Sequence, residues 1–95
     1  MAVKDFVVYK FEGEKWAIGF RYFAPDLDYP TETIQSCVVS VSPAGLTLEG
    51  AALIDKDTVG QVVSGGGCNQ NYHVHFTTTT SVGFILEDEI IVKVR

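Results

Sequence analysis

Apolar and polar side chains alternate along most of this chain, with a period of two residues that is typical of strands with one buried face. The alternation is clearest in Lys15–Tyr22 and in Asn71–Thr78. The apolar positions of these two stretches are predicted to share one core, and they are Trp16, Ile18, Phe20, Tyr22, Tyr72, Val74 and Phe76. No stretch keeps a helical period long enough to predict a helix, so we expect two strands that neighbour or face each other across this core.

Five further stretches are predicted as strands from alternation or from their apolar and β-branched content. They are Asp5–Phe11, Ile34–Val41, Ala51–Ile54, Thr58–Ser64 and Phe84–Val94. Asp88 interrupts the inward series of the last stretch, so we expect a bulge or a sheet edge near it. Turns are predicted at Glu12-Gly13-Glu14 and at Gly65-Gly66-Gly67, where glycine permits backbone angles that most residues avoid.

This succession of short strands indicates the fold class. Strands at intervals of roughly 8 to 12 residues favour two packed antiparallel sheets over a parallel sheet, which would need helical crossovers. We therefore predict an all-β fold, an immunoglobulin-like antiparallel β-sandwich of about seven strands, as a single domain over residues 1–95. A chain of this size has little room for a deep pocket, so its function is expected on the surface.

The longest stretch without a strand pattern is Phe23–Thr33, which we predict to be a surface loop. Asp26 and Asp28, with Glu32 nearby, could suggest a calcium-binding loop. Their spacing is not that of an EF-hand, and the glycine of its turn is missing. A flexible acidic loop is the favoured interpretation.

Charge and composition exclude several classes of function. Twelve acidic and seven basic residues give a formal net charge of −5, without a basic run, which argues against nucleic acid as the partner. Lys4, Asp5 and Lys10 interrupt the apolar N-terminal stretch, so we expect no signal peptide. No apolar run reaches the roughly 20 residues that span a bilayer. We expect synthesis in a bacterial cytoplasm, no membrane partner and no cofactor.

The histidines are the first candidates for chemistry. His73 and His75 are two residues apart on a predicted strand, so both side chains project from one face, as two ligands of a metal could. If the last two strands form a hairpin, His75 falls opposite Glu89, and Thr77 falls opposite Glu87. Such a carboxylate could be a third ligand, but cross-strand polar pairs on a solvated face explain the same pattern. We favour the polar pairs and expect no metal site.

The cysteines and the glycine run offer weaker candidates. Two cysteines are too few for a disulfide scaffold, so Cys37 and Cys68 are predicted to be reduced and too far apart to bridge. Cys37 is expected to face the core, where it would not meet His73 or His75 as a nucleophile meets its base. Gly65-Gly66-Gly67 is followed by neither a helix nor a lysine, so a turn is favoured over a phosphate cradle.

A set of segments in a fixed order resembles a known family. They are Pro43–Leu48, Val63–Gly66, Tyr72–Thr77, Gly83, Glu87-Asp88 and Ile91–Val94. Their order and spacing are similar to those of short Ig-like proteins encoded in phage and prophage tail modules, sometimes described as fibre-to-tail adaptors, over about Ile34–Arg95. The resemblance implies a structural part of a virion and no catalytic residues. Cys68, His73 and His75 depart from the family pattern, so no role is carried over to them.

Tyr72 carries a second resemblance, to the tyrosine that opens the penultimate strand of many Ig-like sandwiches.

The leading hypothesis is a non-enzymatic structural or adaptor module of a phage or prophage tail, which binds tail or fibre proteins through loops or strand edges. One alternative is a carbohydrate-binding domain that uses an exposed aromatic such as Tyr9, Tyr29 or Phe23. A more distant one is a small metal-dependent enzyme built on the two histidines and a carboxylate. The sequence leaves the partner's identity open, and also whether copies of the chain associate within an assembly.

Overall fold

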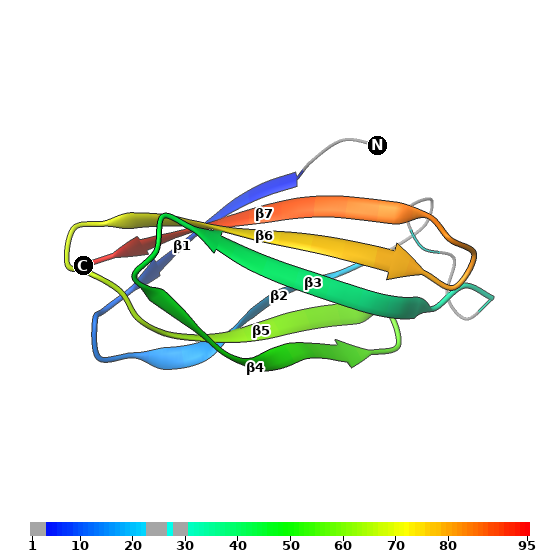
Figure 1. Cartoon of the computed structure of the whole chain (residues 1–95), viewed down its shortest axis with the longest axis horizontal. Coiled ribbons are helices and arrows are strands. Elements are labelled where there is room, and N and C mark those ends of the chain that lie inside the picture. Colours follow the sequence, from blue (N-terminus) through cyan, green and yellow to red (C-terminus); the bar gives the residue numbers. More distant parts are fainter. Residues whose placement is uncertain (1–3, 23–26, 28–30) are drawn as a thin grey trace.

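The computed structural model describes residues 4–22, 27 and 31–95, and it places seven strands in two sheets (Figure 1). The strands are β1 Lys4–Lys10, β2 Lys15–Arg21, β3 Ile34–Ser42, β4 Leu46–Asp55, β5 Thr58–Gly65, β6 Asn71–Thr80 and β7 Ile85–Val94. Burial along β6 and β7 alternates residue by residue, as a strand with one face on a core requires. The predicted all-β class is confirmed.

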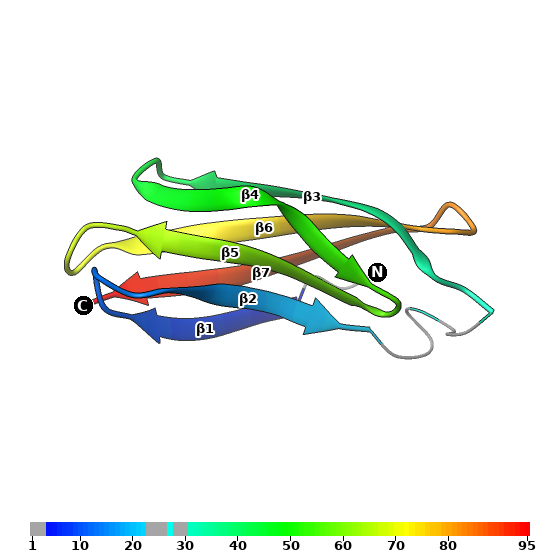
Figure 2. The same cartoon turned by 90° about the horizontal axis from the view of Figure 1, so that it is seen from below.

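The two sheets follow the order of an immunoglobulin sandwich. One sheet has the order β1-β7-β6-β3 and the other the order β2-β5-β4. Strands β2, β5 and β4 correspond to B, E and D of the immunoglobulin fold, while β3, β6 and β7 correspond to C, F and G. The first strand, β1, lies parallel to β7 in the four-stranded sheet, and all other pairs are antiparallel. Figure 2 shows the two layers, with β1 and β2 along one side of the sandwich.

The core lies between the two sheets, as predicted from the alternation. Strands β2 and β6 face each other across it, and the ring of Phe20 meets the edge of the Phe76 ring at a centroid distance of 5.2 Å. The other predicted core residues are buried as well, except that Trp16 is half-buried and packs on the core's margin. The predicted inward residue Cys37 is likewise partly buried against the core.

Two strand predictions need correction. Ala51–Ile54 is only the end of a longer strand, β4, whose alternation is broken by a register shift between Glu49 and Leu53. Gly50 lies within that shift and has a φ of 73°, a backbone conformation that residues other than glycine rarely adopt. The expected bulge near Asp88 is also wrong, because Asp88 lies opposite Phe76 in regular register. The alternative of a sheet edge fits better, since the described pairing of β7 with β1 begins at Asp88.

The predicted surface loop is only partly described. Asp26, Asp28 and most of its other residues lie outside the described part of the chain. Leu27 is fully buried in the core, and Glu32 is buried as well. Because both side chains are buried, the prediction of an acidic surface loop is wrong for these two positions.

Candidate functional site

The strand that carries His73 and His75 pairs with β7 in the predicted register, but the two imidazoles do not converge on one site. His75 lies opposite Glu89 and Thr77 opposite Glu87, as the hairpin model required. The side chains nevertheless pair diagonally, with Nδ1 of His73 against Glu89 and Nε2 of His75 at 3.5 Å from Oε1 of Glu87. Two separate pairs result. Over the described ranges, no three His, Cys, Asp or Glu side chains come together as metal ligands.

Cys37 lies on β3 opposite Thr78, whose hydroxyl oxygen is 3.5 Å from Sγ. Burial raises the pKa of the Cys37 thiol, which disfavours the reactive thiolate. Because His73 and His75 lie on the outward series of β6, the structure does not bring them to the thiol as a catalytic pair. Both cysteines are free thiols, and Cys68 is exposed.

A buried polar cluster forms at the end of the sandwich that carries the β6–β7 turn. The hydroxyl of Tyr22 donates to Oδ2 of Asp88 over 2.7 Å and hydrogen-bonds Oγ1 of Thr78 over 3.2 Å. Burial, reinforced by the Asp88 carboxylate, raises the pKa of Tyr22 far above its ordinary value, so the phenol stays neutral. The cluster was missed because Asp88 was interpreted as a break in the strand. A lone carboxylate in an apolar series is the signal for it.

The opposite end holds a second buried ionisable group that the sequence did not reveal. Lys10 is 1% exposed, and its Nζ donates to the carbonyls of Phe11 at 2.8 Å, Glu12 at 3.3 Å and Gly65 at 2.7 Å. At the same end, the backbone N–H of Gly67 donates to the hydroxyl of Tyr72 over 2.8 Å. This bond to a residue five positions upstream is the tyrosine corner of Ig-like sandwiches, which confirms the resemblance of Tyr72.

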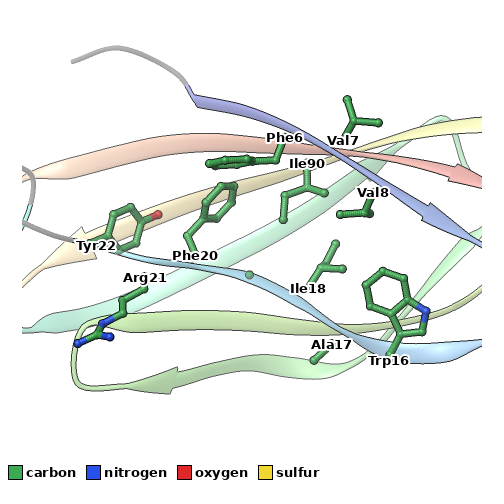
Figure 3. A pocket seen from close by; sticks show the side chains of 11 residues that line it. Phe6, Val7, Val8, Trp16, Ala17, Ile18, Phe20, Arg21, Tyr22 and Ile90 are labelled. Carbon is green, nitrogen blue, oxygen red and sulfur yellow. The ribbon is translucent and has the colours of Figure 1, made fainter.

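An open apolar groove of about 690 Å³ lies between β1 and β2, on the side where the edge strands of the two sheets run next to each other (Figure 2). We call it the β1–β2 groove. Figure 3 shows the side chains that point into it. They are Phe6, Val8, Trp16, Ile18, Phe20 and Ile90. Phe6 remains 51% exposed although its ring lies 5.3 Å from that of Phe20, so the sandwich is not fully closed here.

A second hollow, of about 460 Å³, lies on the outer face of the three-stranded sheet. We call it the outer hollow. Its floor is formed by the small residues Ala17, Gly19 and Gly60, and its rim includes the exposed apolar side chains of Leu53 and Ile54. Strand β2 therefore separates two apolar depressions, one on each of its faces.

The sequence contained a signal for the exposed apolar surface of β1. Phe6, Val7, Val8 and Tyr9 are apolar at both odd and even positions of β1, whereas a strand with one solvated face alternates. A strand of this kind is apolar on both faces, and here the second apolar face is exposed at the edge of a sheet.

The aromatic residues do not form a sugar-binding platform in the described part of the chain. Tyr9 is exposed, but the guanidinium of Arg95 lies 4.4 Å from the centre of its ring. Phe23 and Tyr29 lie outside the described residues. The described ring pairs all involve the buried Phe20, so none of them is a stacked pair of exposed rings.

These features define a class of protein: an Ig-like sandwich whose distinctive surface is an apolar groove at a sheet edge. The comparison with protein families gives the particular one. The chain belongs to the family described as podophage GP4 fiber-tail adaptor protein gp77, whose model matches residues 10–93. The resemblance seen in the sequence is thereby confirmed. A comparison with individually curated proteins gives no match.

Proposed function

We propose that this chain is a non-enzymatic adaptor of a podophage tail, which joins fibre to tail by binding proteins of both kinds and is carried in the virion. The observation that carries the proposal is the family match over residues 10–93. In the described part of the chain, the two histidines belong to separate ion pairs and the Tyr22–Asp88 hydrogen bond is buried in the fold.

The β1–β2 groove supports binding through a strand edge rather than through polar loops. It is lined by apolar side chains and flanked by the outer edges of β1 and β2. Exposed edge strands with apolar surface are the usual templates for pairing with another chain. No described segment forms a helix long and apolar enough to cross a membrane.

The proposed role is tested by assembling particles with and without this chain. Particles that lack it should keep heads and tails but carry no fibres, as seen by electron microscopy of negatively stained samples. Adding the purified chain back should restore fibre attachment. Particles that carry a full set of fibres in its absence would contradict the adaptor role.

Binding to the purified tail and fibre proteins of the same phage is the second measurement. The net charge of −5 favours a partner surface with basic residues, so affinity should fall as salt is raised. Salt-insensitive binding to an oligosaccharide, without affinity for any tail or fibre protein, would favour a carbohydrate-binding domain instead.

A further inference from the structure

The free edge of β2 presents a regular row of backbone groups. Strand β2 pairs only with β5 in the described sheets. The Tyr22 N–H donates to the carbonyl of Asp57, which continues the register beyond the pair of Arg21 and Thr58. Because hydrogen-bonded and non-hydrogen-bonded pairs alternate in an antiparallel sheet, the even-numbered residues of β2 bond to β5. The odd-numbered residues therefore direct their N–H and C=O groups away from it.

The side chains on the two faces of β2 complement this row. Trp16, Ile18 and Phe20 point into the β1–β2 groove. On the other face, Ala17 and Gly19 leave the outer hollow uncovered. Since successive side chains of a strand point to opposite faces, a strand added alongside β2 would place its residues alternately in the groove and over the hollow.

The outer hollow is imposed by the backbone. A Cβ atom on Gly19 would lie 2.0 Å from the carbonyl oxygen of Val59 and 2.8 Å from Cα of Gly60, so only glycine fits. No side chain of β2 can therefore cover this part of the sheet. A large side chain on a neighbouring strand can lie over such a glycine instead.

The charges on β2 select the occupant. Lys15 and Arg21 stand at the two ends of the strand, where Lys15 pairs with Glu49 over 3.8 Å and Arg21 with Asp57 over 3.1 Å. Their side chains are still 61% and 65% exposed, and such solvated pairs are weak enough to leave both cations open to a further carboxylate. Two copies of the chain paired antiparallel about Ile18 would set Lys15 of each copy opposite Arg21 of the other. Like charges directly opposite each other are destabilising, so the edge is protected against self-pairing. A strand with carboxylates at its ends has no such conflict.

We propose that the free edge of β2 binds an extended segment of a partner tail protein by strand addition. The segment has seven residues, with an acidic residue at each end and apolar residues between them. Its second, fourth and sixth side chains enter the β1–β2 groove, and its third and fifth cover the outer hollow. The pattern reads the same in both directions, so it does not depend on strand polarity. The proposal rests on the adaptor role and identifies the surface that performs it.

The probe is a soluble peptide with this pattern: Asp at the first and seventh positions, Val at the second, fourth and sixth, and Phe at the third and fifth, flanked by Gly-Ser pairs. A peptide of the same composition with both Asp residues placed centrally is the control. The patterned peptide should bind at least tenfold more tightly than the control peptide. Equal affinities would contradict the proposed pattern.

Ala17→Pro is the sharpest variant. The Ala17 N–H points away from β5, so its loss removes a donor from the free edge and leaves the pairing with β5 in place. Peptide affinity should fall at least tenfold, while circular dichroism stays that of the parent chain. If this variant does not fold, Phe6→Asp at the groove wall takes its place. Val38→Asp is the matched control for that change, because Val38 is 68% exposed on β3, the opposite edge of the same sheet.

Amide hydrogen exchange gives a direct readout. In the free chain, the amides of Ala17 and Gly19 should exchange quickly and those of Ile18 and Phe20 slowly. Binding of the peptide, or of the recombinant tail protein that the chain recognises, should slow the amide exchange of Ala17 and Gly19.

Full binding without this protection would place the contact elsewhere and overturn the inference, while the adaptor role would stand. Protection that appears in the chain alone as its concentration rises, together with dimers in sedimentation, would identify a second copy as the occupant. Absence of binding to any tail or fibre protein would instead overturn the adaptor role, whether or not the peptide binds.

Discussion

At one end of the sandwich a buried amino group is surrounded by backbone carbonyls, whereas at the other end a buried carboxylate depends on the hydroxyl of one tyrosine. Lys10 donates to three carbonyls and joins the β1–β2 turn to the end of β5. Asp88 is 0% exposed and accepts from Tyr22, while its Oδ1 has no hydrogen-bond partner in the described part of the chain. Two of the carbonyls around Lys10 belong to the β1–β2 turn and the third to the last residue of β5, so all three acceptors are backbone atoms. The lysine end is therefore better satisfied, and the two ends should respond differently to substitution.

The largest effect is expected at the lysine end. Lys10→Ala removes the ammonium that donates to the three carbonyls and the packing of the stem, and it should lower the free energy of unfolding by about 3 kcal/mol. Lys10→Met keeps most of the stem, so it should cost about 2 kcal/mol. Urea denaturation measures both values. A loss below that of the Tyr22 variant described next would reverse the comparison.

At the carboxylate end, Tyr22→Phe removes the phenol that donates to Asp88 and should cost about 2 kcal/mol. Asp88→Asn is the matched control. Its amide oxygen can still accept from Tyr22 and it carries no charge to desolvate, so it should cost less than Tyr22→Phe. A larger cost for Asp88→Asn would show that the negative charge itself is needed.

The raised pKa of Tyr22 at the same end predicts that the folded chain loses stability at alkaline pH. The pKa of Tyr22 is raised in the folded chain above its unfolded value of about 10. Its contribution is therefore complete below about pH 10 and is lost as the pH rises toward the folded-state pKa, with a slope of about 1.4 kcal/mol per pH unit. Unfolding free energies measured between pH 8 and 11 should show this loss in the parent chain and not in Tyr22→Phe. Since other groups titrate identically in both chains, parallel curves would contradict the assignment.

A smaller effect is expected at the tyrosine corner, which belongs to the lysine end. Tyr72→Phe removes the acceptor of the Gly67 N–H and should cost about 1 kcal/mol, because one neutral hydrogen bond is lost. Tyr9→Phe is the control, since the Tyr9 ring is exposed. Equal costs for the two variants would show that the corner does not stabilise the fold.

Substitution in the exposed His–Glu pairs of β6 and β7 should give the smallest change in the free energy of unfolding. This change is the baseline for the substitutions at the two ends of the sandwich. His73→Ala should change the unfolding free energy by less than about 0.5 kcal/mol, because solvated ion pairs contribute little. Stoichiometric zinc should leave the melting temperature unchanged. A rise in melting temperature that disappears in His73→Ala would establish a metal site on this face.

The sequence predicted what period and register control. The alternation in β2 and β6 located the core, and the hairpin register placed His75 opposite Glu89 without error. Prediction from the sequence failed where the environment of a residue depends on partners distant in the sequence. Asp88 looked like an interruption because its partner, Tyr22, is 66 positions away in the sequence. The groove could not be predicted, since the alternation does not show that β1 joins the sheet opposite to that of β2.

The position of β7 has a consequence for biogenesis. Although it is the last strand in sequence, it lies between β1 and β6, and its Ile90 lies opposite Phe6 and lines the β1–β2 groove. On the ribosome, β1 emerges first and has no neighbour in its sheet until β7 follows. The groove therefore exists only in a chain whose last strand has been synthesised and inserted. If the proposed partner segment docks there, its binding depends on the insertion of β7, which leaves the ribosome after all the other described strands.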